Sequence, residues 1–167
     1  VKKNLVLLGM MGVGKTTLGK IVAKKLGLTF IDTDLSIEKS NLMSIEEIFK
    51  KKGEKFFRIE EEKEVLKSLK QKNCIIALGG GAFMNKTLRE NILKNNISIW
   101  LDAAIKTLNN RIKWNQKRPL LKGNYVEKLK KIYTDRKNIY KLANHRIQCD
   151  NLTKNDVIQK IIAIYEK

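Results

Sequence analysis

Short apolar runs alternate with amphipathic stretches along this chain, and the alternation predicts its fold class. Runs that are typical of buried strands occur at residues 4–8, 28–31, 74–78, 97–101 and 145–149. Helical patterns lie between and after them, at residues 16–26, 45–52, 54–72, 86–94, 103–113, 126–143 and 155–165. Strands that alternate with helices indicate an α/β fold with a parallel sheet. Ligands of such sheets bind at the carboxyl ends of the strands.

Local signals add detail to this pattern. Ser44 followed three residues later by Glu47 forms a capping box, which predicts a helix start. The acidic residues at 60–62 lie in a charged helical stretch and are expected to form a solvated face. The 167 residues contain no internal repeat, low-complexity segment or linker. We therefore predict a single domain over residues 1–167.

The net charge of +18 is mostly due to Lys. The basic residues are spread along the whole chain and form no patch interleaved with aromatic residues, so we expect no nucleic-acid partner. The charge favours the attraction of anionic substrates. A chain with few arginines is expected to use them for forked contacts with carboxylate or phosphate. The six arginines are Arg58, Arg89, Arg111, Arg118, Arg136 and Arg146.

The apolar runs also bear on where the protein works. None approaches the roughly 20 residues that a membrane span needs, so we expect no membrane partner. The apolar start is too short for a signal peptide and leads into a glycine loop, which favours a first strand. Cys74 and Cys149 lie in strand-like runs and are expected to be buried, reduced thiols. These features predict a cytoplasmic protein.

The strongest motif is the segment 9–16, Gly-Met-Met-Gly-Val-Gly-Lys-Thr, which matches the P-loop pattern G-x-x-x-x-G-K-[ST]. The expected strand precedes it and the expected helix follows it. Glycines let backbone N–H groups surround a phosphate, and the helix N-terminus adds partial positive charge. We therefore predict ATP binding, with Lys15 at the β- and γ-phosphates and the Thr16 hydroxyl on Mg²⁺. The predicted ATP contacts here are Gly12, Val13, Gly14, Lys15, Thr16 and Thr17.

A second motif, Asp32-Thr33-Asp34, follows the second expected strand. One carboxylate is suited to hold Mg²⁺ through a water, and the other to accept a hydrogen bond from an acceptor hydroxyl and act as base. The alternative is that Thr33 or Asp34 only caps the next helix. Asp102 ends another apolar strand in the manner of a magnesium ligand, but we interpret it as a helix cap. Asp32 is preferred as the carboxylate on the metal side.

These motifs, in this order, resemble those of the shikimate kinases. The residues that carry the resemblance are the P-loop 9–16, Asp32-Thr33-Asp34, Arg58, Gly79-Gly80-Gly81, Arg118-Pro119-Leu120, and Arg136 with Tyr140. Their spacing matches from end to end, so the resemblance covers essentially the whole chain. It implies ATP-dependent phosphorylation of the 3-hydroxyl of shikimate on the route to chorismate and the aromatic amino acids. The implied fold is a three-layer P-loop kinase fold with a central five-stranded parallel sheet, helices on both faces and a short lid.

The resemblance also implies a role for each motif. Shikimate is bound in a region at about residues 33–61 and by further residues, the full set being Asp34, Arg58, Gly79, Gly80, Gly81 and Arg136. The two arginines would hold the substrate carboxylate. A lid at about residues 112–125 would carry Arg118 over the phosphates, and Arg111 would stack on adenine. The expected catalytic residues are Lys15, Asp34 and Arg118, and the expected metal contacts are Thr16 and, through a water, Asp32.

Several alternatives remain open. Arg58, Arg111 and Arg136 each lie in helical stretches, where surface positions are common. Leu152, after the last strand, offers adenine no polar side chain and is left out of the binding set. The rival functions are a P-loop kinase for another small hydroxy acid such as gluconate, a nucleoside monophosphate kinase, and a non-catalytic ATP-binding protein associated with nucleic acid. The expected partners are ATP and shikimate, and the expected state is a monomer.

Overall fold

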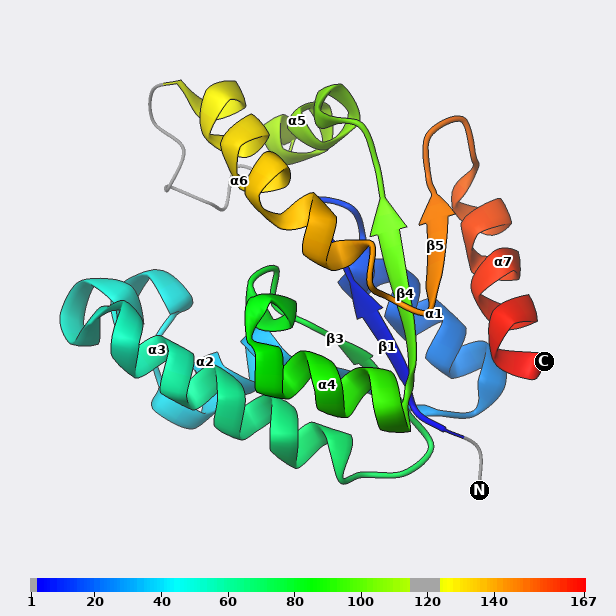
Figure 1. Cartoon of the computed structure of the whole chain (residues 1–167), viewed down its shortest axis with the longest axis horizontal. Helices are drawn as coiled ribbons and strands as arrows, with labels where there is room; N and C mark the ends of the chain where they lie inside the picture. Colours follow the sequence, from blue (N-terminus) through cyan, green and yellow to red (C-terminus); the bar gives the residue numbers. More distant parts are fainter. Residues whose placement is uncertain (1–2, 115–123) are drawn as a thin grey trace.

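Five parallel strands form one sheet at the centre of the protein (Figure 1). The computed structural model describes residues 3–114 and 124–167 of the chain. The strands are β1 (Leu5–Leu8), β2 (Thr29–Asp32), β3 (Cys74–Ala77), β4 (Ile97–Asp102) and β5 (His145–Gln148). They lie side by side in the order β2-β3-β1-β4-β5, and every pair is parallel. The predicted parallel sheet is therefore confirmed.

Helices cover both faces of the sheet (Figure 1). They are α1 (Lys15–Leu26), α2 (Thr33–Asn41), α3 (Ile45–Leu69), α4 (Lys86–Asn95), α5 (Ile105–Trp114), α6 (Tyr125–Tyr140) and α7 (Lys154–Glu166), with a short 3-10 helix η1 (Ala82–Met84). α1 packs with α7 on one face, and α4 with α3 on the other. α5 and α6 pack together beyond the carboxyl ends of β1 and β4 (Figure 1). This arrangement confirms the three-layer α/β fold.

Burial explains why the inner strands have continuous apolar runs. Every residue of β1 and of β3 is buried, because helices cover both faces of a parallel sheet. The edge strands β2 and β5 are partly exposed and carry more polar residues. The main core surrounds the inner strands, and a smaller cluster of Ile37, Ile48 and Phe57 joins α2 to α3.

The helix boundaries agree with most of the predicted signals. Ser44 and Glu47 form both hydrogen bonds of the predicted capping box at the start of α3. The helical geometry of α3 breaks at Gly53, which has φ of 85°, at the boundary between the two predicted stretches 45–52 and 54–72. The helix α2 had no predicted range of its own. Its N-cap is Asp32, whose side chain accepts from the backbone N–H of Leu35, rather than Thr33 or Asp34.

The interpretation of Asp102 as a helix cap is wrong. Its buried carboxylate accepts hydrogen bonds from Tyr133 Oη at 3.2 Å and from Arg146 Nη2 at 2.6 Å. The start of α5 is instead capped by Asp150, whose carboxylate accepts from the backbone N–H of Ala104 at 2.9 Å. The guanidinium of Arg146 comes from the neighbouring strand β5, so the sheet order decides which role Asp102 takes.

Both cysteines are buried free thiols, as expected. Burial raises the pKa of Cys74, and it raises the pKa of Cys149 to about 11. Both side chains are therefore poor nucleophiles at neutral pH. In the two described stretches of chain, no helix combines the length and apolar character that a membrane crossing would need.

Candidate active site

The P-loop connects the end of β1 to the start of α1, as the motif predicted. Gly12 and Gly14 have φ of 82° and 103°, a region that favours glycine. A Cβ atom on Gly12 would also lie 2.7 Å from Ile112 Cγ1 of α5, so a larger residue does not fit. The first turn of α1 contains no acidic residue. No acidic residue of the first turn therefore neutralises the positive end of this helix, which suits a phosphate.

The side chains of Lys15 and Thr16, predicted to bind phosphate and Mg²⁺, lie next to the loop and to Asp32. Lys15 Nζ donates to the carbonyl oxygens of Gly9 at 2.7 Å and Met10 at 3.1 Å, so the ammonium group lies over the loop. Thr16 Oγ1 donates to Asp32 Oδ2 at 2.5 Å. A hydroxyl and a carboxylate oxygen side by side are hard ligands of the kind that Mg²⁺ takes.

No metal cage of protein side chains accompanies this pair. Among residues 3–114 and 124–167, no group of three or more His, Cys, Asp or Glu side chains could hold a metal ion. A Mg²⁺ ion at Thr16 and Asp32 would therefore take its other ligands from phosphate oxygens and water, as is usual for this ion.

A cavity of about 440 Å³ lies beside the P-loop. Five residues predicted to bind ATP line it, namely Gly12, Val13, Gly14, Thr17 and Arg111. Arg111 Nη1 donates to the carbonyl oxygen of Val13 at 3.0 Å, so this arginine lies against the loop rather than only on the surface. Leu152, Val157 and Cys149 add apolar wall. Leu152 was left out of the predicted binding set because it is apolar, yet an apolar wall suits the flat face of a base.

A second group of predicted residues meets at the glycines that follow β3. Each glycine has a different side chain against it, Asp34 at Gly79, Arg136 at Gly80 and Arg58 at Gly81. A Cβ atom at any of these glycines would lie closer than 3.0 Å to that side chain. Only glycine therefore leaves room for a carboxylate and two guanidinium groups, which come from α2, α6 and α3.

This group also adjoins the P-loop. A Cβ atom on Gly80 would lie 3.9 Å from the carbonyl oxygen of Gly9, which in turn binds the ammonium group of Lys15. The predicted acceptor residues and the predicted phosphate residues thus share one region at the carboxyl ends of the strands. The sheet order makes this possible, because β1 and β3 are neighbours.

The buried carboxylate of Glu61 is a functional feature that the sequence reasoning missed. Glu61 was expected on a solvated face, but it is only 4% exposed, and its Oε1 lies 2.8 Å from Arg58 Nη1. Burial raises the pKa of Glu61, against the opposing effects of Arg58 and Arg136. For Arg58, burial lowers the pKa, but its contacts with Glu61 and Glu54 raise it by more. The spacing of three residues between Arg58 and Glu61 was the available signal.

Two hydroxyls hold the glycine segment in place. Thr33 Oγ1 accepts from the backbone N–H of Gly79 at 3.1 Å and donates to the carbonyl oxygen of Ala77 at 3.3 Å. Tyr140 Oη donates to the carbonyl oxygen of Gly80 at 2.5 Å. Burial raises the pKa of Tyr140, although the charge of Arg136 acts in the other direction. The hydroxyl therefore stays protonated and able to donate.

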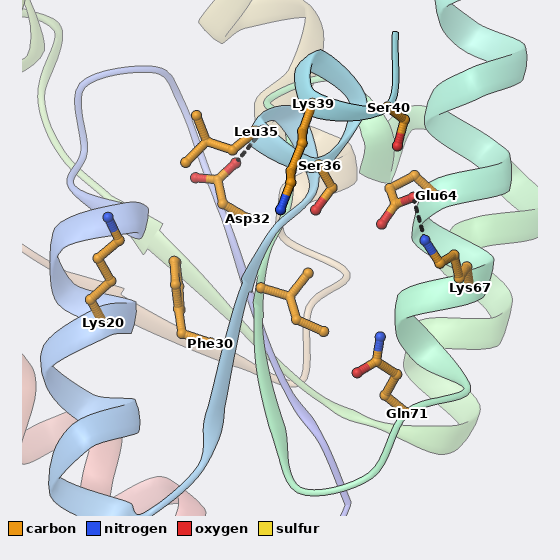
Figure 2. Close-up of a pocket in the computed structure, with 11 residues that line it drawn as sticks. Lys20, Phe30, Asp32, Leu35, Ser36, Lys39, Ser40, Glu64, Lys67 and Gln71 are labelled. Atoms are coloured by element: carbon orange, nitrogen blue, oxygen red, sulfur yellow. Dashed lines mark hydrogen bonds and ion pairs between the residues drawn. The ribbon is translucent and has the colours of Figure 1, made fainter. Parts of the chain in front are cut away.

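A larger cavity, of about 650 Å³, lies along the edge strand β2 between α1, α2 and α3 (Figure 2). Its lining mixes charged and apolar side chains, including Lys20, Phe30, Lys39 and an ion pair of Glu64 with Lys67. Asp32 is the one predicted site residue among those that line it. None of the described residues predicted to contact ATP or shikimate directly lines the larger cavity.

Arg118, predicted for catalysis and ATP binding, lies outside the described residues, as does most of the predicted lid at 112–125. Its assignment stays a prediction from the sequence.

Comparisons with known proteins identify the family and the fold of the chain. The family model for shikimate kinase matches residues 11–166. A shikimate kinase of Sulfurihydrogenibium sp. (strain YO3AOP1) is 41% identical over 160 residues, which cover 96% of each chain. The solved structure of a shikimate kinase from Acinetobacter baumannii in complex with shikimate superposes with a TM-score of 0.91 at 32% identity, covering 98% of this chain and 93% of that one. A gluconokinase from Sinorhizobium meliloti 1021 has a TM-score of 0.64 at 12% identity, which shows a shared fold alone.

Proposed function

The chain belongs to the shikimate kinase family, and we propose that it transfers the γ-phosphoryl group of ATP to the 3-hydroxyl of shikimate, in the biosynthesis of chorismate and the aromatic amino acids. The observation that carries this proposal is the meeting of Asp34, Arg58 and Arg136 at the glycines 79–81, beside the P-loop. A carboxylate and two guanidinium groups match an acceptor that has hydroxyls and one carboxylate.

On the donor side, the P-loop backbone and Lys15 bind the phosphates of ATP, and the base enters the cavity beside Arg111. Lys15 neutralises charge that develops between the β- and γ-phosphates during transfer. Thr16 and, through a water, Asp32 would hold Mg²⁺. When bound, the ion neutralises phosphate charge and orients the triphosphate. Arg118 is proposed to add positive charge from the lid.

On the acceptor side, Arg58 and Arg136 bind the shikimate carboxylate and so fix the ring relative to the P-loop. Glu61 holds Arg58 by the 2.8 Å ion pair, which restricts the orientation of the guanidinium before substrate arrives. Glycines 79–81 carry no side chains of their own, so their backbone groups can line the same site.

Asp34 accepts a hydrogen bond from the attacking hydroxyl and orients its oxygen toward the γ-phosphorus. The new bond joins this oxygen to phosphorus while the bond to the ADP oxygen breaks. The hydroxyl proton leaves to Asp34 or, late in the reaction, to solvent, since a loose transition state makes little demand on a base. The products are ADP and the phosphate ester.

We further propose that the protein is a cytoplasmic monomer with a single domain over residues 1–167. Nucleic acid and membrane are not among the proposed partners. Size-exclusion chromatography with light scattering tests the oligomeric state.

The test of the function is a panel of acceptors, each mixed with ATP, Mg²⁺ and the purified chain, with ADP release as the readout. Shikimate should give turnover well above that of gluconate or any nucleoside monophosphate. Omission of Mg²⁺ should abolish turnover. A preference for gluconate or for a nucleoside monophosphate would overturn the choice of acceptor. Tight, salt-sensitive binding to RNA or DNA without acceptor-stimulated turnover would support the non-catalytic alternative.

A further inference from the structure

The helix α6 carries Arg136 between two tyrosines on one face. Tyr133, Arg136 and Tyr140 follow at spacings of three and four residues, which places all three on the side of the helix where Leu129 is buried. Arg136 itself reaches Gly80 in the acceptor site. The direction in which its guanidinium points therefore depends on how α6 is rotated and tilted over the ends of the strands.

One contact holds the end of α6 beyond Arg136. The hydroxyl of Tyr140 donates to the carbonyl oxygen of Gly80, and its ring packs 5.9 Å from the ring of Trp100 in β4. Tyr140 is fully buried. This contact fixes one end of the helix, while packing against α5 and the burial of Leu129 support the rest. A second polar contact restricts pivoting of α6 about Tyr140 further.

A second contact holds α6 before Arg136. Tyr133 Oη donates to Asp102 Oδ1 at 3.2 Å, at the carboxyl end of β4. Asp102 is 2% exposed, so its carboxylate lies within the protein rather than in solvent. Burial and the nearby carboxylate of Asp102 raise the pKa of Tyr133, so the hydroxyl stays protonated and donates.

Arg146 in turn fixes the carboxylate of Asp102. Its Nε and Nη2 atoms donate to Asp102 Oδ2 at 3.0 and 2.6 Å. The guanidinium also donates to Gln148 Oε1 at 2.8 Å and lies 4.7 Å from the ring of Trp100. Because Arg146 occupies Oδ2, the other oxygen of Asp102 remains directed at Tyr133. Tyr133 of α6 thus donates to the carboxylate of Asp102, and Arg146 of the neighbouring strand β5 fixes the orientation of that carboxylate.

We propose that Tyr133 and Asp102 are positioning residues for the acceptor, which hold α6 at the orientation that directs Arg136 toward the shikimate carboxylate. The inference rests on the proposed function. The two contacts lie on either side of Arg136 along the helix, and together they restrict pivoting of α6 more than one contact would. No described residue of α6 lines the cavity beside the P-loop, so we expect the two contacts to affect the acceptor more than ATP.

The test is Tyr133→Phe, which removes one hydroxyl and keeps the ring. We expect the KM for shikimate to rise by roughly three- to tenfold, less than the full loss of a hydrogen bond to a charged group, because Tyr133 acts on the substrate only through α6. We expect kcat and the KM for ATP to stay unchanged. Calorimetric titration with shikimate should show the same loss of affinity. Tyr165→Phe, the same change in the buried Tyr165 of α7, is the matched control and should leave both KM values unchanged.

A second variant tests whether the effect of Tyr133→Phe on the KM for shikimate depends on Asp102. Asp102→Asn removes the charge that Arg146 fixes and should raise the KM for shikimate as well. In the double variant, the loss should be smaller than the product of the two single losses, because both changes act on one contact. A melting temperature measured for each variant reports any general loss of stability.

Each outcome bears on a different claim. A Tyr133→Phe enzyme with a normal KM for shikimate, or with equal rises for both substrates, would overturn the positioning role. The positioning role would also be overturned if the KM increases of Tyr133→Phe and Asp102→Asn simply multiplied in the double variant. A wild-type chain that does not turn over shikimate would instead refute the proposed function, before any variant is compared.

Discussion

Replacing Gly79 with Ala tests whether Asp34 acts where the structure places it. Gly79 is not among the glycines with positive φ, so its backbone accepts Ala and the effect arises from the added methyl group. That methyl carbon would lie closer than 3.0 Å to Asp34 Oδ1. The carboxylate must therefore move by roughly 1 Å, and a displacement of this size at a reacting group costs about a hundredfold in rate.

We expect kcat for Gly79→Ala to fall by about a hundredfold, equivalent to about 2.7 kcal/mol of transition-state stabilisation. The KM for ATP should stay unchanged. The assay couples ADP release to NADH oxidation at saturating ATP and shikimate. Gly81→Ala is the matched comparison, since its Cβ atom would lie 2.7 Å from Arg58 Nη1 instead. That variant should raise the KM for shikimate and leave kcat nearly unchanged.

Gly79→Ala should therefore lower kcat, whereas Gly81→Ala should raise the KM for shikimate. The contrast is informative because each variant adds one methyl group and the two positions are only two residues apart. A Gly79→Ala enzyme with wild-type kcat would refute the reasoning, because the carboxylate would then not need its observed position. The same would follow from identical kinetic changes in both variants, which would indicate a general disturbance of the segment. Melting temperatures near that of the wild type would show that both variants are folded.

Three further predictions concern single residues of the acceptor site. Asp34→Asn should leave the Kd for ATP intact while kcat falls by at least about a hundredfold; a near-normal rate would remove Asp34 from the mechanism. Arg136→Lys keeps the charge but loses the fork, so the KM for shikimate should rise far more than that for ATP, and equal rises would argue against the carboxylate clamp. Because burial raises the pKa of Glu61 above its ordinary value of 4.5, the wild type should lose stability as pH rises through the interval between these two pKa values. Glu61→Gln lacks this loss, so in urea unfolding the free energy of unfolding of the variant minus that of the wild type should increase with pH and then level off; a difference that does not change with pH would contradict the assignment.

Local sequence patterns predicted most of the secondary structure of the protein. The apolar runs located all five strands, and the capping box at Ser44 and the break at Gly53 fell where the structure has them. These features depend on neighbouring residues only, through side-chain periodicity, cap hydrogen bonds and the backbone freedom of glycine. The helix α2 was not predicted over a range of its own, because its apolar and polar residues give only a weak helical pattern.

The sequence by itself determined the nucleotide loop, the succession along the chain of the strands and of every described helix except α2 and the short η1, and the residue types suited to an acidic acceptor. Only the tertiary structure decided which of those residues meet. Arg58, Arg136 and Asp34 converge because the crossovers bring α2, α3 and α6 to the ends of adjacent strands. The same packing buries Glu61 and pairs Asp102 with Arg146, against the local signals that predicted a solvated face and a helix cap. The physical reason is that solvation and charge pairing depend on partners distant in sequence, and strand order, not spacing along the chain, supplies those partners.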